Sequence, residues 1–201
     1  MFSGIVQKTG KIISVTQHDK VKTARLKLDN IEMCKIGDSV ALNGVCLTVT
    51  AIDAETCELS FDIVPETLRK TNLTHLEKGS LVNVEFSLRY GDFVGGHFVQ
   101  GHVEGIGSIR FIRCEGNARV IGINADRELL KAIINKGFIT IDGMSITVIE
   151  CLEDYFTVTL IPHTLDATIA KEYQIGQNVN LETDPLGRYV YAYTEKMHLV
   201  S

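Results

Sequence analysis

The sequence predicts an all-β protein of two homologous six-stranded antiparallel Greek-key barrels, with short helices and a C-terminal helix. The first observation behind this prediction is self-similarity. Residues 37–50 match residues 136–149 at an offset of 99, and residues 61–73 match residues 158–170 at an offset of 97. The second observation is the alternation of apolar and polar residues, rich in Val, Ile and Thr, within each half. A long period that occurs twice indicates a duplicated domain rather than a solenoid.

The expected strands of each half surround a turn dipeptide. Residues 39–52, SVALNGVCLTVTAI, and residues 138–151, FITIDGMSITVIEC, each indicate a strand, a turn and a strand, with Asn-Gly or Asp-Gly at the turn. These dipeptides favour a type I′ hairpin, in which both central residues need a positive φ. Further strands are expected over residues 57–64 and 155–161. Each half should therefore hold about six strands, most simply closed into an antiparallel barrel.

Short helices are expected between some of the strands. Pro65 and Pro162 occupy equivalent positions of the repeat, and proline is favoured at the first position of a helix. Residues 126–137, DRELLKAIINKG, are expected to form a further helix that ends at a glycine cap.

The segment after Pro185 lies outside the repeat and carries a heptad pattern. Its apolar residues have the 4-3-4-3 spacing of a coiled-coil seam; they are Leu186, Val190, Tyr193, Met197 and Val200. An isolated helix of this length is marginal in water, which favours a helix that joins subunits. The alternative is a surface helix packed on its own domain. The predicted domains are an N-terminal barrel over 1–88, a C-terminal barrel over 96–185 and an oligomerisation helix over 186–201.

Composition argues against several classes of protein. The 201 residues are 45% hydrophobic and 22% charged, with a net charge of -5 and no Lys/Arg cluster among aromatics, so a nucleic-acid partner is not expected. No apolar run approaches the ~20 residues of a membrane span, and the N-terminus does not resemble a secretory signal. Five cysteines without a CxxC motif fit free thiols in a reducing cytosol better than disulfides or a zinc site. We therefore expect a cytoplasmic protein.

The motif GGHFVQGHVEG, residues 95–105, carries two histidines among four glycines. A separation of five residues places the side chains of His97 and His102 on opposite faces of a strand, and about 140° apart on a helix. A shared metal ion is therefore not expected, and at most one of the two should meet a ligand. We expect His97 to be structural, with its side chain bonded to backbone within the glycine turn.

The duplication allows equivalent positions of the two halves to be compared. A position at which the residues differ indicates that one half has taken on a separate role. Ile5 is equivalent to His102, Ser39 to Phe138, and Cys46 to Ser145, whereas threonines recur at the pairs 48/147 and 67/164. Both halves can therefore hold similar small molecules, while the reactive side chains are divided between them. This pattern indicates a reaction that joins two similar ligands, although one ligand at the interface between the domains remains an alternative.

Several blocks in order are similar to the riboflavin synthase family. They are MFSGIV, SVALNGVCLTV, ETLRKTNL, GGHFVQGHVEG, GFITIDGMSITV, IPHTL and VNLETDP, and they span residues 1 to about 185. The resemblance implies a dismutation of two 6,7-dimethyl-8-ribityllumazine molecules, without a metal, flavin or nicotinamide cofactor. It also implies a homotrimer, with the active site between the N-terminal barrel of one subunit and the C-terminal barrel of another. Lumazine synthase is a further candidate partner.

The resemblance also implies roles for individual residues. His102 would transfer a proton, Ser39 and Cys46 would help to deliver or stabilise a nucleophile, and Asp184 would assist proton transfer. The implied substrate-binding positions are Gly4, Ile5, Val6, Cys46, Leu47, Thr48, Asp62, Ile63, Val64, Pro65, Glu66, Thr67, Gly101, His102, Val103, Lys136, Ser145, Ile146, Thr147, Ile161, Pro162, His163, Thr164, Leu165 and Asp166.

Two other classes share part of the pattern. Lumazine proteins have the same duplicated barrel and bind lumazine or flavin as an optical antenna without catalysis. The chain keeps the GGH…GH pattern and the ETLRKTNL and IPHTL blocks, which favours the enzyme. A flavin-dependent reductase barrel is disfavoured, because no glycine fingerprint for a nicotinamide cofactor follows a strand. One departure from the family is His163, which stands where relatives often carry a glutamate.

Overall fold

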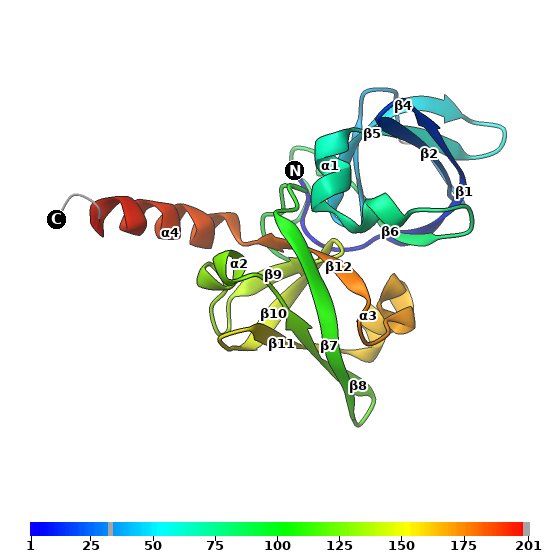
Figure 1. Ribbon diagram of the computed structural model, residues 1–201. Helices are drawn as coiled ribbons and strands as arrows, with labels where there is room; N and C mark the ends of the chain where they lie inside the picture. The colour runs from blue at the N-terminus through cyan, green and yellow to red at the C-terminus, as the bar shows by residue number, and fades with distance from the viewer. Residues whose placement is uncertain (32–33, 199–201) are drawn as a thin grey trace.

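Two closed six-stranded barrels make up most of the computed structural model, which describes residues 1–31 and 34–198 (Figure 1). The first barrel has the order β1-β2-β5-β4-β3-β6 and is closed by antiparallel pairing of β1 with β6. Its strands are β1 (Lys8–His18), β2 (Val21–Lys27), β3 (Ser39–Leu42), β4 (Val45–Asp53), β5 (Glu58–Ile63) and β6 (Leu81–Phe86).

The second barrel repeats this topology, with the order β10-β11-β8-β7-β12-β9 and antiparallel pairing throughout. Its strands are β7 (Gly105–Glu115), β8 (Ala118–Asn124), β9 (Phe138–Ile141), β10 (Met144–Cys151), β11 (Tyr155–Leu160) and β12 (Asn178–Thr183). The predicted fold class of two six-stranded barrels is therefore confirmed.

The alternation in the sequence sorts side chains between the core and the outer face of each barrel. On β4, Val45, Leu47 and Val49 are buried in the first core, whereas Cys46 and Thr48 lie on the outer face. This arrangement follows from the strand period of two residues. The outer face of β4, and likewise that of β10, is therefore available to a ligand.

The two hairpin turns have the predicted type I′ geometry, with positive φ at both central residues. The φ values are 46° at Asn43 and 76° at Gly44, and 43° at Asp142 and 83° at Gly143. The two turns also meet each other, because a Cβ on Gly44 would lie 2.6 Å from the backbone nitrogen of Gly143. The hairpins thus serve as the contact between the barrels as well as the connection between strands.

Helices α1 (Pro65–Lys70) and α3 (Pro162–Ala167) begin with proline, as predicted. Each precedes a short 3-10 helix, η1 (Asn72–His75) or η2 (Ile169–Glu172). The prediction of one helix over 126–137 is wrong, because α2 covers Arg127–Lys131 alone. Lys136 has a φ of 65°, and its N–H donates to Val148 O at 2.9 Å. The end of this segment therefore forms the turn before β9 instead of a helix.

The last helix, α4 (Pro185–His198), projects away from both barrels (Figure 1). The apolar side chains of its heptad pattern are between 65% and 71% exposed; within the described residues these are Leu186, Val190, Tyr193 and Met197. Val200, the last residue of the heptad pattern, lies outside the described residues. The apolar stripe is therefore exposed in the single chain and is not packed on its own domain. No helix within the described ranges is long and apolar enough to cross a membrane.

Candidate active site

Two short segments, residues 2–6 and residues 99–103, cross between the barrels and are called the crossing segments. Phe2 and Val99 form an antiparallel bridge, with N–H···O distances of 2.8 and 3.1 Å. Beyond this crossing, Val6 packs against the core of the second barrel and Val103 packs against the core of the first. Each barrel is therefore completed by the segment that precedes the other barrel in the sequence. The loop that carries His102 consequently belongs, in space, to the first barrel.

Equivalent glycines bring these segments against the outer faces of β4 and β10. The carbonyl of Gly101 accepts from Cys46 N–H at 2.9 Å, and that of Gly4 accepts from Ser145 N–H at 2.7 Å. A Cβ on either glycine would lie 2.6 Å from the Cβ of that partner, and φ is 73° at Gly4 and 77° at Gly101. Both the close approach and the left-handed backbone require glycine.

A buried carboxylate anchors each crossing segment. Glu85 accepts from the amides of Ser3 at 2.7 Å and Gly4 at 3.1 Å. Glu182 accepts from the amide of Gln100 at 2.8 Å and from that of the next glycine at 2.9 Å. Burial raises the pKa of both carboxyl groups, and the amide hydrogen bonds oppose this effect. The two carboxylates fix the backbone on which Ile5 and His102 stand.

Arg188 of α4 supports the loop that carries His102 from outside. Its guanidinium donates to Gln100 Oε1 at 2.5 Å and lies 3.4 Å from Glu104 Oε1. Glu104 in turn accepts from the amide and the hydroxyl of Thr183, at 2.8 and 2.7 Å. The residues on both sides of His102 are thus tied to the start of α4.

The first half-site is a cavity of about 370 Å³ between β4, α1 and the crossing segment. His102 is exposed at this cavity, Cys46 is half-buried, and Thr67 contributes a hydroxyl from α1. The full lining is Val45, Cys46, Glu66, Thr67, Lys70, Thr71, Gly101, His102, Val103 and Glu104. A volume of this size is at the lower end of the range for small-molecule sites.

The second half-site has the same construction on β10 and α3. Ser145 is half-buried beside Gly4, Thr147 is exposed on the outer face, and Thr164 is half-buried on α3. Ile5 takes the place that His102 has in the first half-site, so the two half-sites differ in their ionisable groups.

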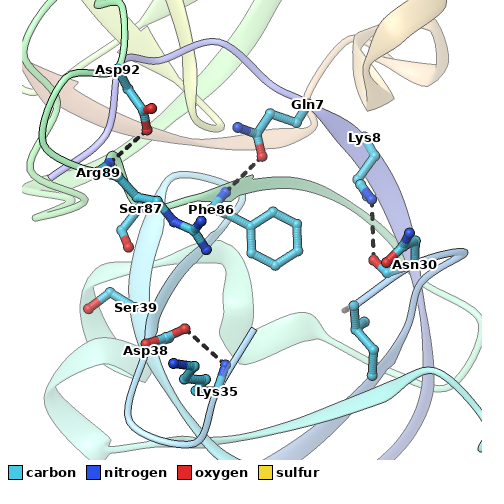
Figure 2. Close-up of a pocket in the computed structure, with 11 residues that line it drawn as sticks. Gln7, Lys8, Asn30, Lys35, Asp38, Ser39, Phe86, Ser87, Arg89 and Asp92 are labelled. Atoms are coloured by element: carbon cyan, nitrogen blue, oxygen red, sulfur yellow. Dashed lines mark hydrogen bonds between the residues drawn. The ribbon is translucent and has the colours of Figure 1, made fainter. Parts of the chain in front are cut away.

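Ser39 lines a different and larger cavity of about 720 Å³ (Figure 2). It stands beside Asp38, whose carboxylate accepts from the amide of Lys35 at 2.9 Å. Ser39 also pairs across the strands with Thr48, on the same outer face as Cys46. Within one chain, Ser39 and His102 therefore line two separate cavities.

The other implied site residues divide into three groups. Leu47, Ile63 and Leu165 are buried in the barrel cores, so their side chains face away from the outer surface. Asp184 is half-buried, lies outside both cavities, and accepts from Leu186 N–H at 3.0 Å. The remaining positions are exposed or half-buried: Val6, Asp62, Val64, Pro65, Lys136, Ile146, Ile161, Pro162, His163 and Asp166.

His97 is buried, but its expected backbone partner is wrong, because the ring bonds to side chains rather than to the backbone of the glycine turn. Nδ1 lies 2.6 Å from Ser145 Oγ, and Nε2 lies 3.2 Å from Thr140 Oγ1. Sequence reasoning missed this contact, although Gly96 is its signal: a Cβ there would lie 2.6 Å from Ser145 Cβ. Among the described residues, no three His, Cys, Asp or Glu side chains converge as a metal site.

Known proteins share both the sequence and the fold. The family model for the lumazine binding domain matches residues 3–87 and again residues 100–184. Riboflavin synthase of Bacillus subtilis (strain 168) is 41% identical over 98% of this chain and 91% of its own length. Riboflavin synthase of Escherichia coli (strain K12) is 40% identical over 98% of this chain and 93% of its own length.

Solved structures of LumP have the same fold. LumP complexed with riboflavin superposes with a TM-score of 0.84 at 26% identity, and covers 91% of this chain and 99% of its own. LumP complexed with 6,7-dimethyl-8-(1'-D-ribityl) lumazine superposes with a TM-score of 0.82 at 25% identity, with the same coverage of both chains.

Proposed function

Because the chain belongs to the riboflavin synthase family, we propose that its two kinds of half-site hold two lumazine molecules that react with each other. The protein is a transferase of four-carbon units. Two molecules of 6,7-dimethyl-8-ribityllumazine give riboflavin and 5-amino-6-ribitylamino-2,4(1H,3H)-pyrimidinedione. The atoms of the two substrates account for all atoms of the two products, so the overall reaction balances without an oxidant or a reductant.

His102 is the proposed base for the acidic methyl group at C7 of one lumazine. The carbanion that forms there is delocalised into the fused rings, so a base that works near neutral pH is sufficient. His102 is exposed at the first cavity, where a ring stacked on the outer face of β4 would present this methyl group. Asp184 would assist proton transfer from the start of α4.

Cys46 and Ser39 are the proposed polar groups beside the partner lumazine. Cys46 lies in the cavity with His102, and Ser39 lies across the paired strands from Thr48. Both can donate a hydrogen bond to a nucleophile that adds to the second ring. Most of the rate enhancement is expected from holding two rings face to face, because fixed orientation replaces a bimolecular encounter.

The observation that carries the proposal is a duplicated half-site in which a histidine stands on one crossing segment and Ile5 on the other. Both halves present a threonine pair, a crossing glycine and an anchoring carboxylate, whereas the exposed histidine at the crossing segment is in one half. Two like ligands with unlike roles fit this arrangement better than one ligand does. We further propose domains at 1–88, 96–185 and 186–201, with an additional association with lumazine synthase and a cytoplasmic location.

The test is to incubate the purified protein with 6,7-dimethyl-8-ribityllumazine alone, in buffer that contains a chelator. We expect one riboflavin for every two lumazines consumed, measured by absorbance and chromatography. Binding with a change in fluorescence but without riboflavin would instead place the chain with the lumazine-binding antenna proteins and would refute the proposed reaction.

The assembly proposed for the active site is a homotrimer that α4 holds together. The uncovered apolar stripe on α4 supports this proposal. We expect Tyr193→Glu to dissociate the trimer in sedimentation and to lower activity with it. Glu195→Lys, on the opposite face of the helix, is the matched control and should leave the trimer intact. A Tyr193→Glu monomer with full activity would refute a site between subunits.

A further inference from the structure

His97 is a buried, fully bonded side chain to which the proposed reaction assigns no part. It is 7% exposed, and both ring nitrogens contact hydroxyl groups, Ser145 Oγ at 2.6 Å and Thr140 Oγ1 at 3.2 Å. The ring of Phe138 stacks on it, with the centroids 5.0 Å apart and the planes 8° apart. Burial lowers the pKa of His97, against a smaller opposing effect of Asp184, so the ring is neutral at pH 7. The imidazole is therefore held in one plane and one charge state.

The hydrogen-bond requirements of Thr140 decide which nitrogen carries the proton. Thr140 is 2% exposed, and within the described part of the chain its hydroxyl contacts no polar atom other than His97 Nε2. A buried hydroxyl that only accepted would leave its proton unsatisfied, which costs about 1–3 kcal/mol. Thr140 therefore donates to Nε2, and the proton of the neutral ring resides on Nδ1. Nδ1–H then donates to Ser145 Oγ.

This chain of donors leaves the proton of Ser145 free for another acceptor. The oxygen of Ser145 is occupied by His97, and its backbone N–H is occupied by the carbonyl of Gly4. The side chain is half-buried on the outer face of β10, at the second half-site. Among the described residues no group accepts from this hydroxyl, so its proton is available to a ligand on the outer face of β10.

The first half-site has no such arrangement. Cys46, the equivalent of Ser145, has no side-chain hydrogen bond among the residues that the structure describes, and packs with Phe2 and Val99. A thiol is also a weaker donor than a hydroxyl. The two half-sites thus differ in how firmly they present a hydrogen-bond donor to a ligand.

We propose that His97 is a positioning residue for the second half-site, where it orients the Ser145 hydroxyl as a donor to an acceptor atom of the bound ligand. The inference rests on the proposed function, because lumazine and flavin rings present carbonyl oxygens and ring nitrogens as acceptors. His97 itself touches no reacting atom in this scheme. Its effect on the ligand passes entirely through Ser145.

The test compares His97→Asn with His97→Gln. The amide nitrogen of Asn occupies about the position of Nδ1, whereas that of Gln occupies about the position of Nε2. His97→Asn should therefore keep the contact with Ser145, and His97→Gln should lose it. We expect kcat for riboflavin formation and the affinity for lumazine to remain within about threefold of wild type for Asn and to fall about tenfold for Gln. If His97 serves only to fill space, Gln should match or exceed Asn.

A double-mutant cycle with Ser145→Ala tests the route through Ser145. In the Ser145→Ala background, His97→Gln should change either quantity by less than about twofold, because the hydroxyl that it orients is gone. Effects that multiply in the double variant would overturn the proposal, as would the absence of any effect in both single variants. His18→Gln, an exposed histidine at the end of β1, is the matched control, and thermal unfolding verifies the folded state of each variant. Wild-type protein that forms no riboflavin would refute the proposed function. The same double-mutant cycle, measured by affinity for lumazine, would still decide the role of His97.

Discussion

The two barrels have one construction and differ at the few side chains that face a ligand. Each has the same strand order, a crossing segment fixed by a buried carboxylate, and a glycine pressed against the outer face of a strand. On this shared frame, Cys46 is replaced by Ser145, and Ile5 by His102. Duplication therefore preserved the residues that shape the half-site and allowed the reactive groups to diverge.

The interface between the barrels shows the same division. Asn83 Nδ2 donates to Asp142 O, and Asn180 Nδ2 donates to Asn43 O, both at 2.8 Å. The symmetry breaks at the side chains of the turns, because Asn43 on one side faces Asp142 on the other. The hydroxyl of Tyr173 donates to the Asp142 carboxylate at 2.7 Å. The second barrel thus carries a buried acid at the contact where the first carries an amide.

The largest expected effect comes from making the two crossing segments alike. His102→Ile gives the second segment the residue that the first has at position 5. If His102 is the base, we expect kcat to fall between a hundredfold and ten-thousandfold, because that is the usual contribution of general acid–base catalysis. The measurement is riboflavin formation at saturating lumazine. His75→Gln, at the exposed end of η1, is the control and should retain activity.

The reciprocal change sharpens the comparison. Ile5→His, added to His102→Ile, places an imidazole in the other half-site. We expect it to restore little activity, because the ligand beside Ser145 has a different role from the ligand beside Cys46. Recovery of most of the lost rate would show that the half-sites are interchangeable and would contradict the assignment of the base to one of them.

The next effect concerns stability and the difference between Asn43 and Asp142. Asp142 is fully buried, and desolvation raises its pKa from 3.8 to about 6 despite hydrogen bonds from Asn180, Tyr173 and Asn72. Between these pH values the folded protein holds a proton that the unfolded chain releases. The free energy of unfolding should therefore fall as pH rises from about 4 to above 6, by at most about 3 kcal/mol.

Asp142→Asn should remove this dependence, because the amide mimics the protonated acid and restores the symmetry with Asn43. We expect the variant to match wild type near pH 4 and to be the more stable protein at pH 7, as measured by urea unfolding at several pH values. Parallel stability curves for the two proteins would show that Asp142 does not titrate in this range. Asp62→Asn, at an exposed position, is the matched control.

The fold was predictable because its signals are local and repeated. Apolar and polar residues alternate on either side of Asn43-Gly44 and Asp142-Gly143, and this alternation predicts which side chains point into the barrel. The positive φ values at these turns agree with the type I′ geometry that the dipeptides favour. The helix expected over 126–137 was wrong because its second half is held by tertiary contacts. Asn135 Oδ1 accepts from Cys151 N–H at 2.7 Å, which no periodicity reveals.

The site was less predictable, because it depends on contacts between segments that are distant in sequence. The internal comparison singled out Ser39, Cys46 and His102. It did not show that the His102 loop completes the first barrel, nor that His97 contacts Ser145, 48 residues away. The sequence signal of these contacts is glycine at positions 4, 96 and 101, since each allows a backbone to pass close to Cys46 or Ser145. A glycine indicates a close approach but does not identify the partner.

The smallest of the expected effects separates the two anchoring carboxylates. Glu85→Gln and Glu182→Gln each leave one backbone amide facing an amide group instead of an oxygen, which should lower the free energy of unfolding by about 1–2 kcal/mol in both. Their effects on catalysis should differ. Glu182 fixes the segment that ends in His102, so Glu182→Gln should lower kcat, whereas Glu85→Gln moves Ile5 and should mainly raise KM. Steady-state kinetics beside urea unfolding measures both quantities. Equal losses of kcat in the two variants would mean that the crossing segments act as a structural pair, without a division of roles between the half-sites.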